Sequence, residues 1–339
     1  MGPEGATVRT QTGRRDFLGA GVALAGVVVA GPLLAQQPPA AAAGARVKGP
    51  PVWLDMDQAE LDAAYDQIKY APNLPQITKR YATNSEAVRS RLGAPRRFAY
   101  GATAIEALDV YATHEPNAPI NIFIHGGAWR VGLAKDYAFP AELFVYAGAH
   151  LVVPDFVWVQ DADGSLMPMA DQVRRAVAWV HRNAQSFGGD SERIYVSGHS
   201  SGGHLAGVVL TTDWRKEFNL PADTVKGGLC CSGIFDLKPA RLSARSAYVK
   251  FTDEMEQALS SQRHLEHLNA PVIVAYGTLE TPEFQRQSRD FAAAAKSVGK
   301  PVQLLVAEGY NHFEIIETLG NPYGLLGRAV LEQMKLGQA

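Results

Sequence analysis

The sequence predicts an α/β protein whose central sheet is mostly parallel and carries helices on both faces. Apolar runs typical of buried parallel strands occur at 120–124 and 149–153. A stretch with apolar residues at helical spacing follows at 169–180, and strand-like and helix-like segments continue to alternate after it. Such alternation is typical of a parallel sheet with helical connections.

The composition is that of a globular protein without a charged partner surface. Of the 339 residues, 47% are apolar, which is enough to bury a core. The formal net charge is -2 with acids and bases well mixed, so neither nucleic acid nor an anionic membrane is indicated as a partner. The two cysteines, Cys230 and Cys231, are neighbours, which disfavours a disulfide between them, and their apolar surroundings indicate a buried strand.

Residues 1–45 are expected to be a twin-arginine signal peptide and linker. The segment 12–18 carries Arg14 and Arg15 before Phe-Leu, and an apolar stretch over 18–30 follows it. That stretch is shorter than the ~20 residues of a membrane-spanning helix. The alternative is a tail in which paired arginines occur by chance. The export machinery is therefore an expected partner, and the mature protein is expected to be periplasmic or secreted.

Residues 50–339 are expected to form one domain that begins with helices. Asp57 can cap a first helix, which Pro72 and Pro75 end, and a second helix covers 77–92. Because these helices precede the first strand, they are expected to form a cap or an outer layer. Plain structural packing explains them equally well.

The remaining strands and helices can be assigned one after another along the chain. Turn residues such as Gly101 separate the strands from one another, and Gly188-Gly189 closes the first long helix. Strands are expected at 97–100, 107–111, 120–124, 149–153, 193–197, 225–232, 271–276 and 302–307. Helices are expected at 169–180, 201–210, 283–298 and 320–335.

The segment Gly198-His199-Ser200-Ser201-Gly202 matches the G-x-S-x-G nucleophile elbow. A strand precedes it and a helix follows it, which is the context that the motif requires and which predicts the α/β-hydrolase fold. The glycines permit a tight turn that exposes the Ser200 hydroxyl as a nucleophile. The backbone N–H of Ser201 is expected to help bind an oxyanion. The alternative is an ordinary structural turn.

A second motif, His125-Gly126-Gly127-Ala128-Trp129, follows the strand at 120–124. Acyl transfer places negative charge on the carbonyl oxygen of the substrate, and backbone N–H groups must meet that charge. Because glycine lets the backbone approach closely, Gly126 and Gly127 are expected to complete the oxyanion hole with Ser201.

The acid and the base should follow the nucleophile in that order along the chain. Glu280 lies on the loop after the strand at 271–276, and His312 lies on the loop after the last strand. A carboxylate there can orient the imidazole toward Ser200. Two rivals for the acid stay open: Glu283, whose other role is exposed complementation of a helix N-terminus, and Asp236, which lies one strand too early.

No metal or cofactor is expected. His264 and His267 are three residues apart on an expected helix, but no third ligand accompanies them. His199 and His204 flank the elbow and are expected to hydrogen-bond locally. Aromatic side chains that follow strand ends could line an acyl or aromatic pocket, although core packing explains each about as well. They are Trp129, Tyr137, Phe156 and Trp158.

Over roughly 65–319 the chain resembles the kynurenine formamidase (arylformamidase) family of α/β-hydrolases, near the esterases related to hormone-sensitive lipase. The likeness rests on the His-Gly-Gly and elbow motifs and on three further strings. These are Ser232-Gly233-Ile234-Phe235-Asp236-Leu237, Ser288-Arg289 and Asn311-His312-Phe313-Glu314. The resemblance implies hydrolysis of an aryl formamide such as N-formylkynurenine, or of small carboxylic esters. In the family the triad acid is an aspartate, whereas Glu280 stands here.

The sequence therefore predicts a serine hydrolase that acts on a small ester or amide through an acyl-enzyme. Because tryptophan breakdown is cytosolic, an exported relative is expected to attack an external substrate. The alternatives are a catalytically inactive exported binding protein of the same fold and a metal-dependent amidohydrolase, which would need a ligand cluster.

Overall fold

A sheet of eight strands in the order β1-β2-β4-β3-β5-β6-β7-β8 forms the centre of the structure. The structure, a computed structural model, describes residue 2 and residues 46–337. Apart from residue 2, the expected signal peptide and linker lie outside the described residues. Residues 48–339 group into one unit.

The sheet is mostly parallel, which confirms the predicted fold class. Only β1 (Arg96–Ala99), β2 (Ala107–Tyr111) and β4 (His150–Pro154) pair antiparallel with one another, in that order. All other pairings are parallel. The remaining strands are β3 (Ala118–Ile124), β5 (Gly189–His199), β6 (Gly227–Cys231), β7 (Val272–Gly277) and β8 (Val302–Ala307).

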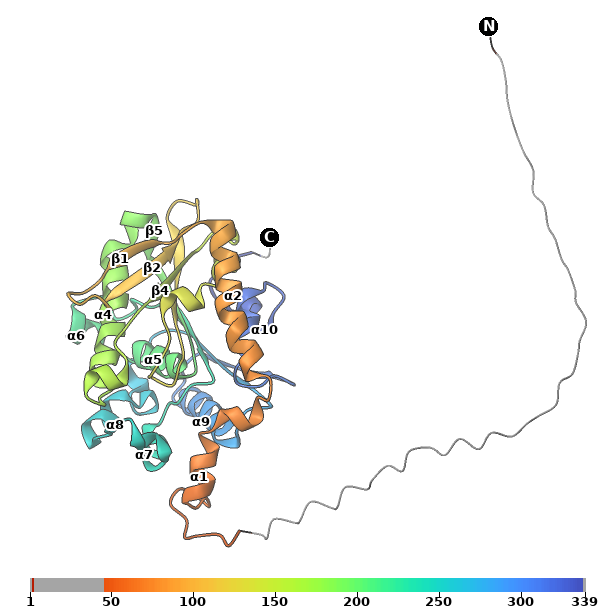
Figure 1. Cartoon of the computed structure of the whole chain (residues 1–339). Coiled ribbons are helices and arrows are strands. Elements are labelled where there is room, and N and C mark those ends of the chain that lie inside the picture. The colour runs from red at the N-terminus through yellow and green to blue at the C-terminus, as the bar shows by residue number, and fades with distance from the viewer. Residues whose placement is uncertain (1, 3–45, 338–339) are drawn as a thin grey trace, which may run out of the picture. The chain divides into compact units, whose positions relative to one another are not determined.

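Helices cover both faces of the sheet because strand side chains alternate between the faces. In β3, Ile120 and Ile122 pack in one core cluster and Phe123 in the other. The first cluster joins the sheet to α4 (Met167–Asn183), α5 (Ser201–Leu210) and α9 (Pro282–Ser297). The second joins it to α2 (Leu74–Leu92), α3 (Ala141–Tyr146) and α10 (Leu325–Gln333). Figure 1 shows α4 and α2 on opposite sides of β2 and β4.

The first helices differ from the prediction in where they begin and end. Asp57 caps α1 (Gln58–Ala64) in a capping box, as its position predicted. Pro75, however, opens α2 rather than ending a helix, because proline is tolerated in the first turn, where no backbone N–H is needed. A 3₁₀ turn, η1 (Gln67–Tyr70), joins the two helices.

Short helices fill the connections that the sequence left unassigned. The predicted helix at 320–335 begins later than expected, as α10, because Pro322 interrupts the chain after the 3₁₀ turn η8 (Ile315–Gly320). His264 lies between two 3₁₀ turns, so it does not share a helix with His267. No helix within 46–337 is long and apolar enough to cross a membrane. The other short elements are η2 (Ala134–Tyr137), η3 (Val159–Ala162), η4 (Ala184–Phe187), α6 (Trp214–Phe218), α7 (Leu237–Leu242), η5 (Ala244–Ala247), α8 (Asp253–Leu259), η6 (Ser261–Arg263) and η7 (Leu265–His267).

Candidate active site

The turn between β5 and α5 places Ser200 in a strained conformation. Its φ of 59° and ψ of -124° lie where side chains larger than glycine are rarely found. The flanking glycines explain why the chain can turn so sharply. A Cβ on Gly198 would lie 2.1 Å from the carbonyl oxygen of Gly202, and one on Gly202 would lie 2.0 Å from that of Ile124. The motif is thus a steric requirement of this turn.

Ser200, His312 and Glu280 form a continuous chain of hydrogen bonds. Ser200 Oγ lies 2.8 Å from His312 Nε2, and His312 Nδ1 lies 2.8 Å from Glu280 Oε2. The side chains of His312 and Glu280 are almost fully buried, with 3% and 0% exposed. This arrangement can move the serine proton to the imidazole while the carboxylate stabilises the positive charge that develops.

The second carboxylate oxygen of Glu280 is also fully engaged. Glu280 Oε1 accepts a hydrogen bond from the backbone N–H of Gly277 at 2.7 Å and another from Ser232 Oγ at 2.6 Å. Sequence reasoning gave Ser232 no role, because it lies 48 residues from Glu280 in the chain. The one feature of the sequence that could have pointed to Ser232 is its place in the segment 232–237, which is among those that resemble the formamidase family.

Neither rival acid contacts His312. Glu283 lies in the first turn of α9, but it is buried rather than exposed, so the expected exposed role is wrong. Its two carboxylate oxygens pair with the Arg286 guanidinium at 2.6 and 2.7 Å. Asp236 caps the backbone N–H of Lys238 and pairs with Arg263. Both carboxylates are therefore occupied elsewhere in the structure.

The loop after β3 presents free backbone N–H groups beside Ser200. Within 46–337, the N–H groups of Gly126, Gly127 and Ser201 have no hydrogen-bond acceptor. Gly127 has a φ of +121°, and a Cβ on it would lie 2.0 Å from the carbonyl oxygen of Val131. A Cβ on Gly126 would lie 3.1 Å from that of Ser200. These positions require glycine, and their N–H groups can meet negative charge on a substrate oxygen.

Buried histidines hold this loop and the turn in place. The His125 ring is stacked between Tyr137 and Phe156, with centroid distances of 5.1 and 4.4 Å. His204 accepts a hydrogen bond from Trp129 Nε1 at 3.2 Å and donates through Nε2 to the carbonyl oxygen of Leu259 at 2.9 Å. The ring is therefore neutral, and burial lowers the pKa of His204 to about 4.

His199 performs a similar role next to His312. Its Nε2 donates to the backbone carbonyl of His312 at 2.7 Å, and the two rings lie 4.9 Å apart. Burial and the neighbouring His312 hold the pKa of His199 well below its usual range. The expected hydrogen bond exists, but it joins residues that are 113 positions apart and is not local.

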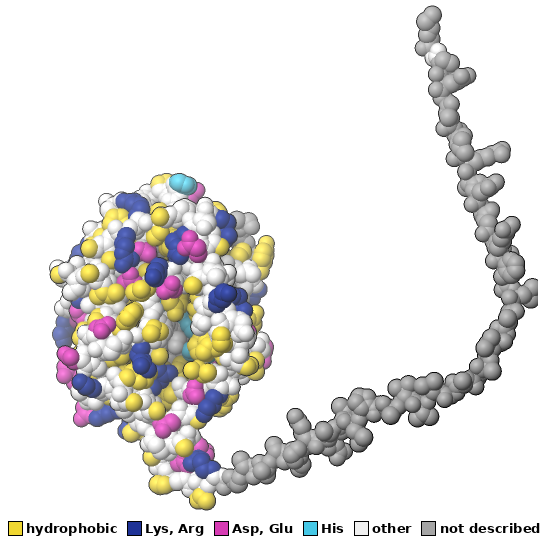
Figure 2. All heavy atoms as spheres, in the orientation of Figure 1, with side chains coloured by type: hydrophobic (Ala, Val, Ile, Leu, Met, Phe, Trp, Pro, Cys, Tyr) yellow, Lys and Arg dark blue, Asp and Glu magenta, His cyan; other side chains and the backbone are white. Residues whose placement is uncertain are grey.

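A cavity of about 330 Å³ opens at Ser200. Figure 2 shows a hollow in this face with histidine atoms inside it, bordered mainly by hydrophobic side chains. Residues 65–81, which run from the end of α1 into α2, supply much of the cavity wall. The first helices therefore form a cap over the site. The lining residues are Tyr65, Asp66, Gln67, Ile68, Leu74, Thr78, Tyr81, Gly126, Gly127, Ala128, Val131, Tyr137, His199, Ser200, Arg245, His312 and Phe313.

Of the four aromatic residues expected in a pocket, Tyr137 lines this cavity and the other three do not. Trp129 turns its indole N–H to His204. Phe156 stacks on His125. The indole N–H of Trp158 donates to the carbonyl oxygen of Gly132 at 3.0 Å. Phe156 and Trp158 contact residues of the glycine loop, and Trp129 joins that loop to α5, so these three side chains hold the loop in place.

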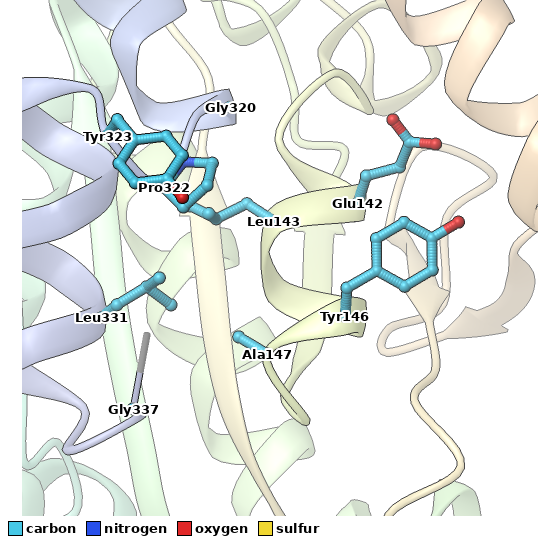
Figure 3. A pocket seen from close by; sticks show the side chains of 9 residues that line it. All are labelled: Glu142, Leu143, Tyr146, Ala147, Gly320, Pro322, Tyr323, Leu331 and Gly337. Atoms are coloured by element: carbon cyan, nitrogen blue, oxygen red, sulfur yellow. The ribbon is translucent and has the colours of Figure 1, made fainter. Parts of the chain in front are cut away.

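A separate cavity of about 270 Å³ lies between α3 and the C-terminal segment. Figure 3 shows Leu143 of α3 pointing toward Pro322 and Tyr323. The carboxylate in its lining, Glu142, is paired with Arg91. None of its lining residues belongs to the Ser200 site, so it offers no hydrolytic chemistry.

Comparison with known proteins agrees with this architecture. The family described as BD-FAE matches residues 108–228. Kynurenine formamidase of Danio rerio is 30% identical over 295 residues, which cover 83% of this chain and 98% of that protein. Esterase LipC of Mycobacterium tuberculosis is 28% identical over 251 residues, 66% of this chain and 60% of that protein. The structure of a candidate thioesterase from Silicibacter sp. covers 79% of this chain and 97% of its own with a TM-score of 0.69 and 22% identity.

Proposed function

Because this chain belongs to the kynurenine formamidase family of α/β-hydrolases and is a hydrolase of esters or amides, we propose that it works through an acyl-enzyme on Ser200. The hydrogen-bond chain Ser200–His312–Glu280, which opens on the cavity beside unpaired backbone N–H groups, is the observation that carries the proposal. A nucleophile, a base and an orienting acid are the parts that such a reaction needs.

In the proposed reaction, Ser200 Oγ attacks the carbonyl carbon of the substrate while its proton moves to His312 Nε2. The carbonyl π electrons move onto the oxygen, whose charge is met by the N–H groups of Gly126, Gly127 and Ser201. The tetrahedral intermediate collapses, the bond to the leaving oxygen or nitrogen breaks, and that atom takes the proton from His312. Water then repeats the sequence on the acyl-enzyme, releasing the acid and restoring Ser200.

The proposed substrates are small carboxylic esters and aryl formamides. The family membership supports both, and a cavity of about 330 Å³ suits molecules of modest size. We further propose that the twin-arginine export machinery delivers the protein to the periplasm or beyond. The paired Arg14 and Arg15 followed by an apolar stretch support this location. The substrate would then be an external ester or amide.

One assay panel tests the proposal. The purified protein is offered 4-nitrophenyl esters of increasing acyl length and N-formyl anilines, with and without a chelator. We expect turnover of at least one class, with no effect of the chelator. Turnover that requires a metal would contradict the serine mechanism. No turnover of any compound would favour the inactive binding protein of the same fold.

A further inference from the structure

We propose that Arg245 binds a carboxylate on the substrate, away from the bond that is cleaved. This inference rests on the proposed hydrolase reaction and adds a substrate class to it: esters or amides that carry one carboxylate. Arg245 belongs to η5 and lines the same cavity as Ser200 and His312. It is the only lysine or arginine among the residues that line this cavity.

The guanidinium of Arg245 is held in a fixed position by neutral groups. Nη1 donates to Tyr248 Oη at 2.6 Å, and Nη2 donates to the backbone carbonyl of Tyr65 at 3.2 Å. The guanidinium carbon lies 5.4 Å from the ring centroids of both Tyr65 and Trp129. These contacts orient the planar group before any substrate arrives, and a rigid guanidinium is well suited to a carboxylate.

Within residues 46–337, no carboxylate pairs with the charge of Arg245. Among the residues that the structure describes, no carboxylate oxygen lies within ion-pair distance of this side chain, and its buried Nε–H has no acceptor. Two other half-buried arginines are paired with carboxylates, Arg263 with Glu256 and Arg286 with Glu283. A partly desolvated cation that has only neutral partners would be stabilised by an anionic ligand at this site.

The one carboxylate in the cavity lining does not serve this purpose. Asp66 accepts a hydrogen bond from the backbone N–H of Ile68 at 3.2 Å and lies 3.8 Å from Lys69 Nζ. The Asp66 carboxylate is therefore engaged by groups at the start of η1. Arg245 remains the group in the cavity that can attract an anion, and charge-assisted hydrogen bonds are the strong ones.

A structural role for Arg245 is the competing explanation, because its bond to Tyr65 ties the N-terminal segment to η5. Loss of that hydrogen bond would lower kcat/KM equally for every substrate. Loss of an anion site would lower kcat/KM only for substrates that carry the carboxylate. Matched substrate pairs therefore separate the two explanations.

The experiment compares kcat/KM for two pairs that differ by one carboxylate. Formanilide against 3-formamidobenzoate places the charge on the leaving group, and 4-nitrophenyl butyrate against 4-nitrophenyl hydrogen glutarate places it on the acyl group. The variants are Arg245→Met, Arg245→Lys and, as a control, Arg130→Met. Arg130 lies over the ring of the same Tyr248 at 4.7 Å but does not line the cavity.

We expect wild type to prefer the charged member of one pair by tenfold or more, mainly through a lower KM. Arg245→Met should abolish the preference and keep turnover of the neutral member, whereas Arg130→Met should keep both. Arg245→Lys, which retains the charge, should keep part of the preference. Absence of a preference in wild type, or an equal loss on both members in either Arg245 variant, would overturn the inference. Turnover of the neutral members by wild type reports on the proposed function separately.

Discussion

Ser232 Oγ donates a 2.6 Å hydrogen bond to Glu280 Oε1, the carboxylate oxygen that His312 leaves free. Ser232 follows β6 with a φ of 52°, and its backbone N–H donates to the carbonyl oxygen of Ala275 at 2.7 Å. This conformation points the hydroxyl at the acid instead of continuing the strand. Ser232 is therefore a positioning residue, which fixes the carboxylate that in turn fixes the imidazole.

Replacement of Ser232 by alanine should lower kcat by roughly ten- to a hundredfold, because a hydrogen bond to a charged group contributes about 1.5–3 kcal/mol. KM should change little, since Ser232 does not line the cavity. Steady-state kinetics on one 4-nitrophenyl ester measures this split, and thermal unfolding controls for loss of structure. An unchanged kcat, or a KM effect alone, would contradict a positioning role.

The two neighbouring glutamates should behave differently when each is replaced by glutamine. In Glu280→Gln the amide cannot stabilise a positively charged imidazole, and in a comparable triad this change costs roughly 10⁴-fold in kcat. Kinetics on a single ester measures the effect. Retention of kcat within tenfold would mean that Glu280 is not the triad acid.

Glu283→Gln should mainly affect stability. It removes the buried one of the two carboxylates that pair with the half-buried Arg286 and leaves only the more exposed Asp290, and breaking such a buried pair costs roughly 3 kcal/mol. Denaturant unfolding measures this cost, and the kcat of the folded fraction should stay near that of wild type. If Glu283→Gln instead lost catalysis while staying fully stable, the two glutamates would have exchanged roles.

Acid should destabilise the fold in a way that depends on His204. Because burial lowers its pKa to about 4, the folded state keeps this ring neutral where the unfolded chain is protonated. The stability that comes from the neutral ring is fully present above pH 6.5, falls as the pH drops toward 4, and amounts to on the order of 3 kcal/mol. His204→Gln should lower stability at pH 7.5 and flatten the fall between pH 6.5 and 4.5. Urea unfolding at several pH values checks this, and an equally steep fall in the variant would contradict it.

Export should depend on the paired arginines. Replacing Arg14 and Arg15 by lysines should leave the precursor inside the cell, because the export receptor reads the arginine pair. Cell fractionation followed by immunoblotting measures the distribution, and the unaltered chain is the control. Normal export of the double variant would remove the case for the twin-arginine route and for an external substrate.

The predictable parts of the site are those that local sequence dictates. Gly198 and Gly202 can be recognised because a Cβ at either position would collide with backbone, so the turn leaves a fixed pattern in the sequence. Glu280 and His312 can be proposed because each follows a strand, and parallel strands bring their ends to one edge.

The remaining parts depend on contacts between distant segments. Ser232 follows β6 and bonds to Glu280 after the neighbouring strand β7, 48 residues later in the chain. Arg245 reaches the cavity from a connection of short helices that has no clear periodicity. Trp129, Phe156 and Tyr137 all come after strand ends in the sequence, and only their packing shows that Tyr137 lines the cavity whereas the other two hold the glycine loop. Glu283 has the sequence position of an exposed helix start, yet Tyr65 and Arg286 bury it.

The role of Ser200 as nucleophile is best tested by the kcat of Ser200→Ala on the best ester or formamide of the panel. Loss of a triad nucleophile costs on the order of 10⁶-fold in kcat, and a fluorophosphonate should modify Ser200 in wild type but leave the variant unmodified. Unfolding curves that coincide for the two proteins show that the fold is intact. We expect the variant to lose both turnover and labelling. A folded variant with activity within tenfold of wild type would contradict that role.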